Sequence, residues 1–178
     1  MLFIEQDVDA PLGGRLDRWL AANDNPGTIY LPLVMTDSGH DISNGDESFA
    51  TVYGNMIDRS LDRPATAGMA VTSSRSGSIL HLEVQLDNRS GATLSAANDA
   101  TLTALVWQEP VDPEAIPVVA TARTAPIPSL VDGSSAKIVL EASVSALDPD
   151  RTRWVVIADY QPNGTFEAYD TLQAVTGP

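Results

Sequence analysis

From residue 64 to the end of the chain, apolar and polar positions alternate in short runs. In SILHLEVQLDN, at residues 78–88, every second position is aliphatic and the positions between are mostly polar. This period of two is typical of a strand with one buried and one wet face, and His81 falls on the wet face. Turn-forming stretches such as NRSG, VDGSS and QPNG separate seven strand candidates of this kind.

Seven short strands in one continuous stretch predict an antiparallel β-sandwich of immunoglobulin-like type over residues 64–178. Trp107 and Trp154 lie in two well-separated strand candidates, and their large apolar rings favour burial between the sheets. A sandwich also leaves strand edges whose free backbone groups favour association with another chain.

Residues 1–63 follow a different pattern, in which strand-like and helix-like segments alternate. LFIEQDV at 2–8 and the unbroken apolar run TIYLPLVM at 28–35 predict strands, the second one covered on both faces. Residues 11–23 and 46–63 carry apolar side chains at helical spacing, and Pro64 ends the second segment. The apolar face of the second helix comprises Phe49, Val52, Tyr53, Met56, Ile57 and Leu61. The order predicts a β-α-β-α segment with a parallel strand pair, and the whole chain is therefore of the α+β class.

The composition narrows the range of partners and chemistry. The chain has 24 acidic and 10 basic residues, for a net charge of −14. Such a charge repels phosphate backbones and anionic lipids, so we expect no nucleic-acid partner. No apolar run approaches the ~20 residues of a membrane span, so we expect no membrane insertion. The chain contains no cysteine, which excludes disulfides and thiol redox chemistry.

The densest group of polar side chains lies in LPLVMTDSGHDISNGDES, at residues 31–48. Its apolar run ends at residue 35, and residues 36–48 are here called the acidic loop. Hard cations such as calcium prefer carboxylate oxygens, and the candidate ligands are Asp37, Asp41, Asp46 and Glu47. The spacing does not fit an EF-hand loop, because Gly45 would occupy a ligand position. The alternative is a polar loop held by local side-chain hydrogen bonds.

Ser38, His40 and a nearby aspartate raise the question of a hydrolase triad. No G-x-S-x-G motif accompanies them, which argues against such a triad. The other histidine, His81, is predicted on the wet face of a strand. We therefore expect no catalytic residue, no cofactor and no enzymatic activity, with calcium as the one candidate ion.

Two stretches, LHLEVQLDNRSGATLSAANDATLTALVWQE and RWVVIADYQPNGTFEAYDTLQA, resemble immunoglobulin-like modules of secreted bacterial proteins. The order of the two parts resembles the outer-membrane-protein-28-related group, in which a thioredoxin-like domain precedes such a sandwich. In that group a redox Cys-x-x-Cys would stand where this chain has VDAPLGGR, at residues 8–15. Because both thiols are missing, the resemblance implies a cell-surface or extracellular location without the redox activity.

Together these patterns predict a non-enzymatic extracellular module that acts as a structural or interaction protein, binding a protein partner or self-associating through strand edges. The alternative is a ligand-binding or ion-binding protein, or an enzyme, that uses the acidic loop at residues 36–48. An enzyme would require a concave pocket with converging polar groups, whereas an interaction module requires only accessible surfaces.

Overall fold

A computed structural model describes residues 33–44, 48–112, 114–162 and 169–178 of the chain. The elements, in chain order, are β1 (Leu33–Thr36), the 3₁₀ turn η1 (Asp37–Gly39), β2 (Asp41–Asn44), α2 (Phe49–Leu61), β3 (Ala67–Ser76), β4 (Ile79–Asn88), η2 (Ala96–Asn98), β5 (Thr101–Gln108), β6 (Val119–Pro126), β7 (Ser135–Ser143), η3 (Pro149–Arg151), β8 (Thr152–Tyr160) and β9 (Asp170–Gly177).

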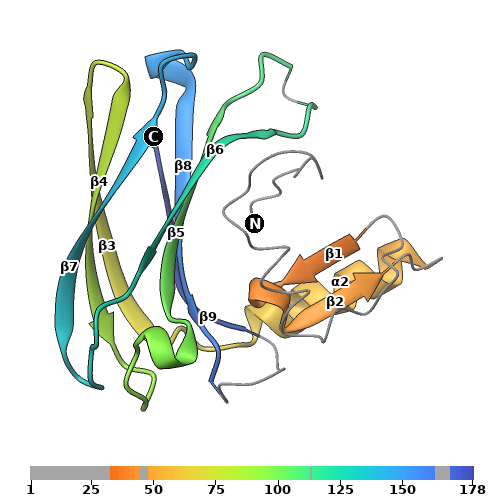
Figure 1. Cartoon of the computed structure of the whole chain (residues 1–178). Coiled ribbons are helices and arrows are strands. Elements are labelled where there is room, and N and C mark those ends of the chain that lie inside the picture. The colour runs from red at the N-terminus through yellow and green to blue at the C-terminus, as the bar shows by residue number, and fades with distance from the viewer. Residues whose placement is uncertain (1–32, 45–47, 113, 163–168) are drawn as a thin grey trace.

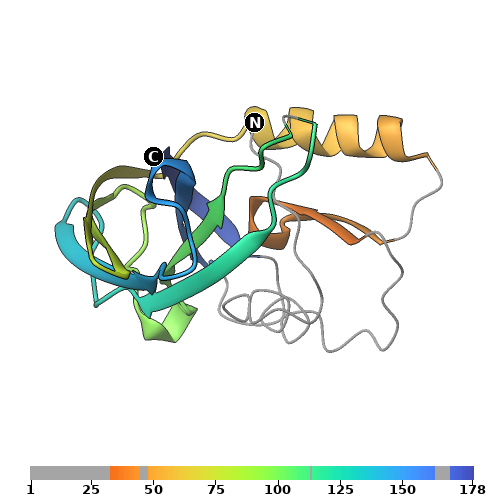
Figure 2. The ribbon, with the colours of Figure 1, turned by 90° about the horizontal axis from the view of Figure 1, so that it is seen from above.

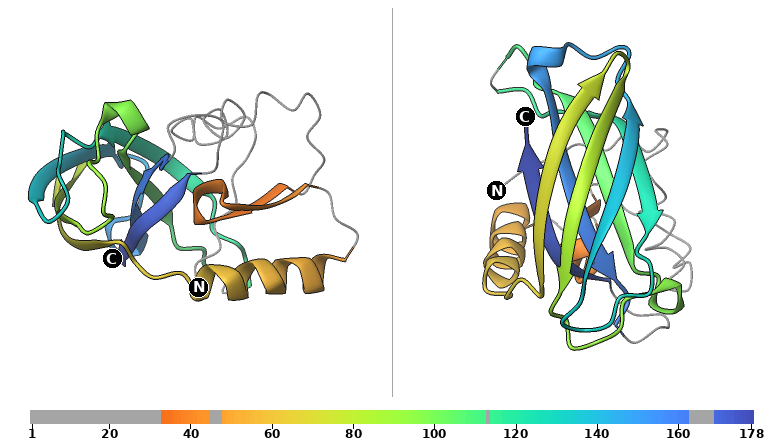
Figure 3. Two further views of the ribbon diagram at one scale, coloured as in Figure 1. Left: turned by 90° about the horizontal axis from the view of Figure 1, so that it is seen from below. Right: turned by 90° about the vertical axis from the view of Figure 1, so that its left-hand side faces the viewer.

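Strands β3 to β9 form two antiparallel sheets that face each other as a β-sandwich (Figure 1). One sheet has the order β3-β4-β7 and the other has the order β6-β5-β8-β9. The second view in Figure 3 shows the three-stranded sheet in front of the four-stranded one. The predicted antiparallel sandwich is thus confirmed, and β8, with the sequence TRWVVIADY, is one of its strands.

The main core lies between the two sheets and follows the predicted alternation. Leu80, Leu82, Val84 and Leu86 of β4 point into it, while His81 lies on the other face of the strand. Trp154 is part of this core. Trp107, although buried, belongs to a second cluster with Leu105, Val119, Ala122 and Val155, on strands of the four-stranded sheet. That sheet is therefore apolar on both faces, which a one-sided alternation does not predict.

The predicted parallel pairing of residues 2–8 with residues 28–35 stays a prediction, because residues 2–8 lie outside the described residues. The run at 28–35 is described only from residue 33, where β1 begins, and β1 pairs antiparallel with β2. The chain reverses at η1, where Asp37, Ser38 and Gly39 all have positive φ angles. A turn of four residues joins adjacent antiparallel strands, because a parallel pair needs a long crossover. The predicted strand at 2–8 and helix at 11–23 lie outside the described residues, and the thioredoxin-like segment is not confirmed.

Helix α2 lies alongside the β1–β2 hairpin (Figure 2). It lies within the predicted helical segment at 46–63. On its apolar face Met56 is buried, whereas Phe49 and Leu61 at the two ends are exposed. The rings of Phe49 and Tyr53 stack with centroids 5.6 Å apart. Across the described ranges, every helix is too short or too polar to span a bilayer.

Candidate functional site

The tip of the β1–β2 hairpin is held against the ends of β8 and β9. The Ser38 hydroxyl donates to Oδ2 of Asp159 at 2.8 Å and lies 2.8 Å from the Thr171 hydroxyl. Ser38 adopts φ 61°, a left-handed conformation that costs about 1–2 kcal/mol for a residue with a side chain. A backbone held in such a conformation at a polar cluster is a reason to consider this region as a functional site.

Asp159 is the buried carboxyl group of the cluster. Only 1% of the residue is exposed. Its Oδ1 accepts a hydrogen bond from the Thr101 hydroxyl at 2.9 Å, while its Oδ2 accepts the one from Ser38. A buried carboxyl group is tolerated where donors replace the lost water, and here donors come from β5 and from the hairpin tip. Asp159 therefore joins the sandwich to the hairpin.

Arg63 bridges two carboxylates, those of Asp37 and Asp170, beside the Ser38–Asp159 hydrogen bond. Its guanidinium lies 3.2 Å from Asp37 and 2.7 Å from Asp170, and Nδ1 of His40 lies 3.2 Å from the same Asp170 oxygen. Burial raises the pKa of the neighbouring Tyr160 hydroxyl, and the negative charge of Asp170 raises it further. The charges of the hairpin tip are thus compensated by groups after α2 and on β9.

Asp41 of β2 forms a two-point contact with Arg59 of α2, at 2.6 Å from Nε and 2.9 Å from Nη2. The hydrogen bond from Arg59 is the main reason that the pKa of the Asp41 carboxyl lies below its usual value; burial opposes it. This contact fixes the end of α2 on the hairpin, since a paired carboxylate and guanidinium have a preferred mutual orientation.

Two of the four candidate calcium ligands are therefore engaged by arginines. Asp37 contacts Arg63 and Asp41 contacts Arg59, while Asp46 and Glu47 lie outside the described residues. In the described part of the chain, no three histidine, aspartate or glutamate side chains are grouped as a metal site would require. Calcium binding by the acidic loop stays a prediction.

The groups considered for a hydrolase triad have separate partners. Ser38 donates to Asp159, whereas the His40 imidazole contacts Asp170. His81 lies on the wet face of β4, where its Nδ1 is 3.1 Å from Glu141 on the neighbouring strand β7. The polar side chains of the hairpin tip thus connect the hairpin to β8, to β9 and to the residues after α2.

No protein-family model matches this sequence, and no curated protein matches it. Among solved structures, HBP35 of Porphyromonas gingivalis is similar, with a TM-score of 0.60 and 12% identity, over 95% of this chain and 60% of that one. Red sea bream transglutaminase gives a TM-score of 0.42 at 11% identity, over 82% of this chain and 22% of that one. The first likeness shows a shared fold alone, and this chain spans 60% of the length of HBP35.

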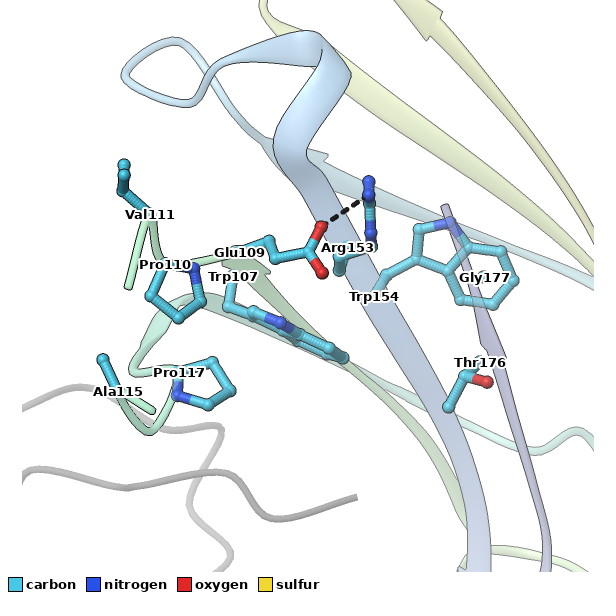
Figure 4. A pocket seen from close by; sticks show the side chains of 10 residues that line it. All are labelled: Trp107, Glu109, Pro110, Val111, Ala115, Pro117, Arg153, Trp154, Thr176 and Gly177. Carbon is cyan, nitrogen blue, oxygen red and sulfur yellow. Dashed lines mark hydrogen bonds and ion pairs between the residues drawn. The ribbon is translucent and has the colours of Figure 1, made fainter. Parts of the chain in front are cut away.

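A second candidate site lies at the other end of the sandwich, where the sequence analysis identified nothing. The β5–β6 loop (residues 109–118) and the adjoining ends of β8 and β9 line an open groove of about 710 Å³, here called the Trp107 groove (Figure 4). Its lining residues are Trp107, Glu109, Pro110, Val111, Ala115, Pro117, Arg153, Trp154, Thr176 and Gly177. The available sequence signal was EPVDPEAIPVV, a turn segment that keeps apolar residues where a solvated loop would be polar.

Two substitutions at Ser38 separate its hydrogen bonds from its backbone conformation. Ser38→Ala removes the hydroxyl contacts with Asp159 and Thr171 and should lower the free energy of unfolding by about 2 kcal/mol. Ser38→Gly removes the same contacts but adopts positive φ without steric cost, so it should be about 1 kcal/mol less destabilising. The greater freedom of glycine in the unfolded chain offsets only part of this difference. Urea denaturation measures both, and equal values would contradict strain at this turn.

The Asp41–Arg59 contact should make stability depend on pH in the acid range. Because the folded-state pKa of Asp41 is lowered, its contribution is present above the unfolded value of about 4 and is lost as pH falls through the folded value. Arg59→Ala should therefore lower stability slightly at pH 7 and leave it unchanged near pH 2. Urea denaturation at both pH values measures this, and a difference of the same size at both would exclude the assignment.

Proposed function

We propose that this chain is a non-enzymatic interaction module of an extracellular or cell-surface protein. The observation that supports it is a concentration of exposed apolar side chains in the β5–β6 loop. Of seven large hydrophobic residues exposed in the described ranges, three are on this loop: Val111 (84% exposed), Ile116 (57%) and Val118 (50%). Exposed apolar groups gathered in one place favour contact with another molecule.

The contacts of the polar cluster favour a binding role over catalysis. At the hairpin tip, Ser38 contacts Asp159 and His40 contacts Asp170, which also contacts Arg63. These polar groups therefore hold the hairpin on the sandwich. The Trp107 groove, in contrast, is lined largely by proline, valine, alanine and tryptophan. An apolar groove with few polar groups is suited to binding. The acidic composition and the resemblance to secreted bacterial modules support the extracellular location.

Selection from a random-peptide library tests this function without a known partner. The immobilised chain is expected to enrich peptides that soluble wild-type chain competes off. The variant V111S/I116S/V118S is expected to lose this enrichment. The matched control Val131→Ser changes a similarly exposed valine elsewhere on the sandwich and should keep it. Enrichment that is absent, or equal for the two variants, would contradict the proposed function.

Self-association through strand edges is a second candidate, favoured by exposed Val139 on the edge strand β7. Light scattering of the concentrated chain should then show species heavier than the monomer, and Val139→Lys should reduce them, because a charge on an edge strand opposes pairing. Repeating the measurement with calcium and with EDTA tests the acidic loop, since an ion-organised contact would respond to both. A strict monomer in every condition would contradict this candidate.

A further inference from the structure

We propose that the Trp107 groove binds extended, proline-containing peptides that carry lysine or arginine. This inference rests on the proposed interaction function and names the chemistry of its partner. It follows from three features of the groove: an available indole N–H, apolar walls that include two prolines, and exposed carboxylates on the same loop.

The first feature is the Trp107 indole. The residue is 5% exposed and packed in the second apolar cluster, so its ring is fixed in place. Its Nε1 has no hydrogen-bond partner among the described residues. The Nε1 of Trp154 is unpaired and fully buried, whereas the Nε1 of Trp107 is unpaired without being fully buried. A fixed N–H donor at the edge of a groove is suited to a ligand carbonyl. A polyproline II peptide has no internal hydrogen bonds, so its carbonyls are available.

The second feature is the shape and chemistry of the walls. Figure 4 shows the Trp107 ring between Pro110 and Pro117 on one side and Thr176 on the other. Pyrrolidine rings and aliphatic side chains bury well against such a surface. Proline-rich peptides also lose little conformational entropy on binding, because their extended form exists beforehand, and aromatic-lined grooves are where they dock.

The third feature is charge. Asp112 and Glu114 are exposed on the β5–β6 loop beside the groove. Glu109 is already oriented by Arg153, whose Nη2 lies 2.6 Å from its carboxylate. With a net charge of −14, the chain as a whole favours a cationic ligand. The same charge disfavours a second copy of this chain as the occupant, because two acidic loops would face each other.

Isothermal titration with synthetic peptides tests the proposal. A peptide with two prolines in a P-x-x-P arrangement and two flanking arginines is expected to bind the folded chain. Replacing both prolines with alanine, or both arginines with glutamate, should weaken binding at least about tenfold. Equal affinity of the proline-free peptide, or of the glutamate peptide, would overturn the proposal.

Two variants locate the site. Trp107→Phe removes the N–H but keeps an aromatic ring, and it should weaken binding about tenfold. D112N/E114Q alters only exposed groups and should weaken binding while reducing its dependence on salt, which keeps the test valid even where Trp107→Phe fails to fold. Val131→Ser, on a different loop, is the control and should bind as the wild type does.

The outcomes separate this inference from the proposed function. Peptides that the random library enriches through the β5–β6 loop, but that lack prolines and cationic residues, would overturn the inference and leave the interaction function standing. Light scattering that shows a dimer dispersed by V111S/I116S/V118S would identify a second copy as the occupant and overturn the inference as well. Binding that requires proline, arginine and Trp107 together would support both.

Discussion

Replacing Asn88 with aspartate is expected to lower the free energy of unfolding by about 3 kcal/mol. Asn88 is fully buried at the end of β4. Its Nδ2 donates to the carbonyls of Ala92 at 2.8 Å and Leu130 at 2.9 Å, and its Oδ1 accepts from the backbone N–H and the hydroxyl of Ser90. The aspartate would place a negatively charged oxygen against two carbonyl oxygens in a fully buried site.

The side chain of Asn88 joins two loops at one end of the sandwich, through Ala92 and Leu130. The substitution should therefore loosen both loops together. The same residue also bonds through its backbone to Ser134 and Gly133. Urea denaturation measures the change in unfolding free energy, with the slope of the transition as a check that the folded state stays compact. The position thus holds together segments that are about forty residues apart in the chain, as the Asn88–Leu130 separation of 42 shows.

Asn98→Asp is the matched control for this substitution. Asn98 also donates to a carbonyl, that of Thr93, and accepts from a backbone N–H, that of Ser95, but it lies nearer to solvent. Water can satisfy the groups released there, so the expected loss is about 1 kcal/mol. Losses of equal size at the two positions would show that burial is not what makes Asn88 important.

The sandwich was predictable because each of its strands carries its own signal. In β4 the period of two is complete, and in β8 an apolar run is bounded by turn residues on both sides. What the pattern did not show is which strands are covered on two faces. Trp107 and Val155 point away from the main core into a second cluster, and no local property of a strand indicates what lies beyond its outer face.

The hairpin was not predictable from the same pattern. Strand β2 has four residues, of which Ile42 alone is strongly apolar, so a period cannot be read from it. The turn depends on positive φ angles at Asp37 and Ser38, residues that adopt this conformation only where other contacts hold it. Those contacts come from Asp159 and Thr171, which are more than a hundred positions away in the sequence.

The acidic loop shows the same limit in its chemistry. The sequence grouped Asp37 and Asp41 as oxygen ligands because they are close along the chain. The structure pairs Asp37 with Arg63, which follows α2, and Asp41 with Arg59, which lies within α2. A run of carboxylates in the sequence therefore predicts a locally negative segment. Which group each carboxylate contacts depends on how the elements pack against one another.

Asp159→Ala is expected to lower the free energy of unfolding by about 2–3 kcal/mol, because it leaves the Thr101 and Ser38 hydroxyls without their carboxylate acceptor. Asp159→Asn keeps one acceptor oxygen and should cost less. If the carboxylate couples the hairpin to the sandwich, Ser38→Ala should have little further effect in the Asp159→Ala background.

A double-mutant cycle measures that coupling, expected at about 2 kcal/mol for one buried hydrogen bond to a carboxylate. Thr103→Val is the control, since the Thr103 hydroxyl contacts Thr124 within the sandwich, and its effect should add to that of Asp159→Ala. Strict additivity of Ser38→Ala and Asp159→Ala would show that the two positions stabilise the protein independently. The hairpin would then be held by Arg63 and its two carboxylates, and Arg63→Ala should become the most damaging change at this interface.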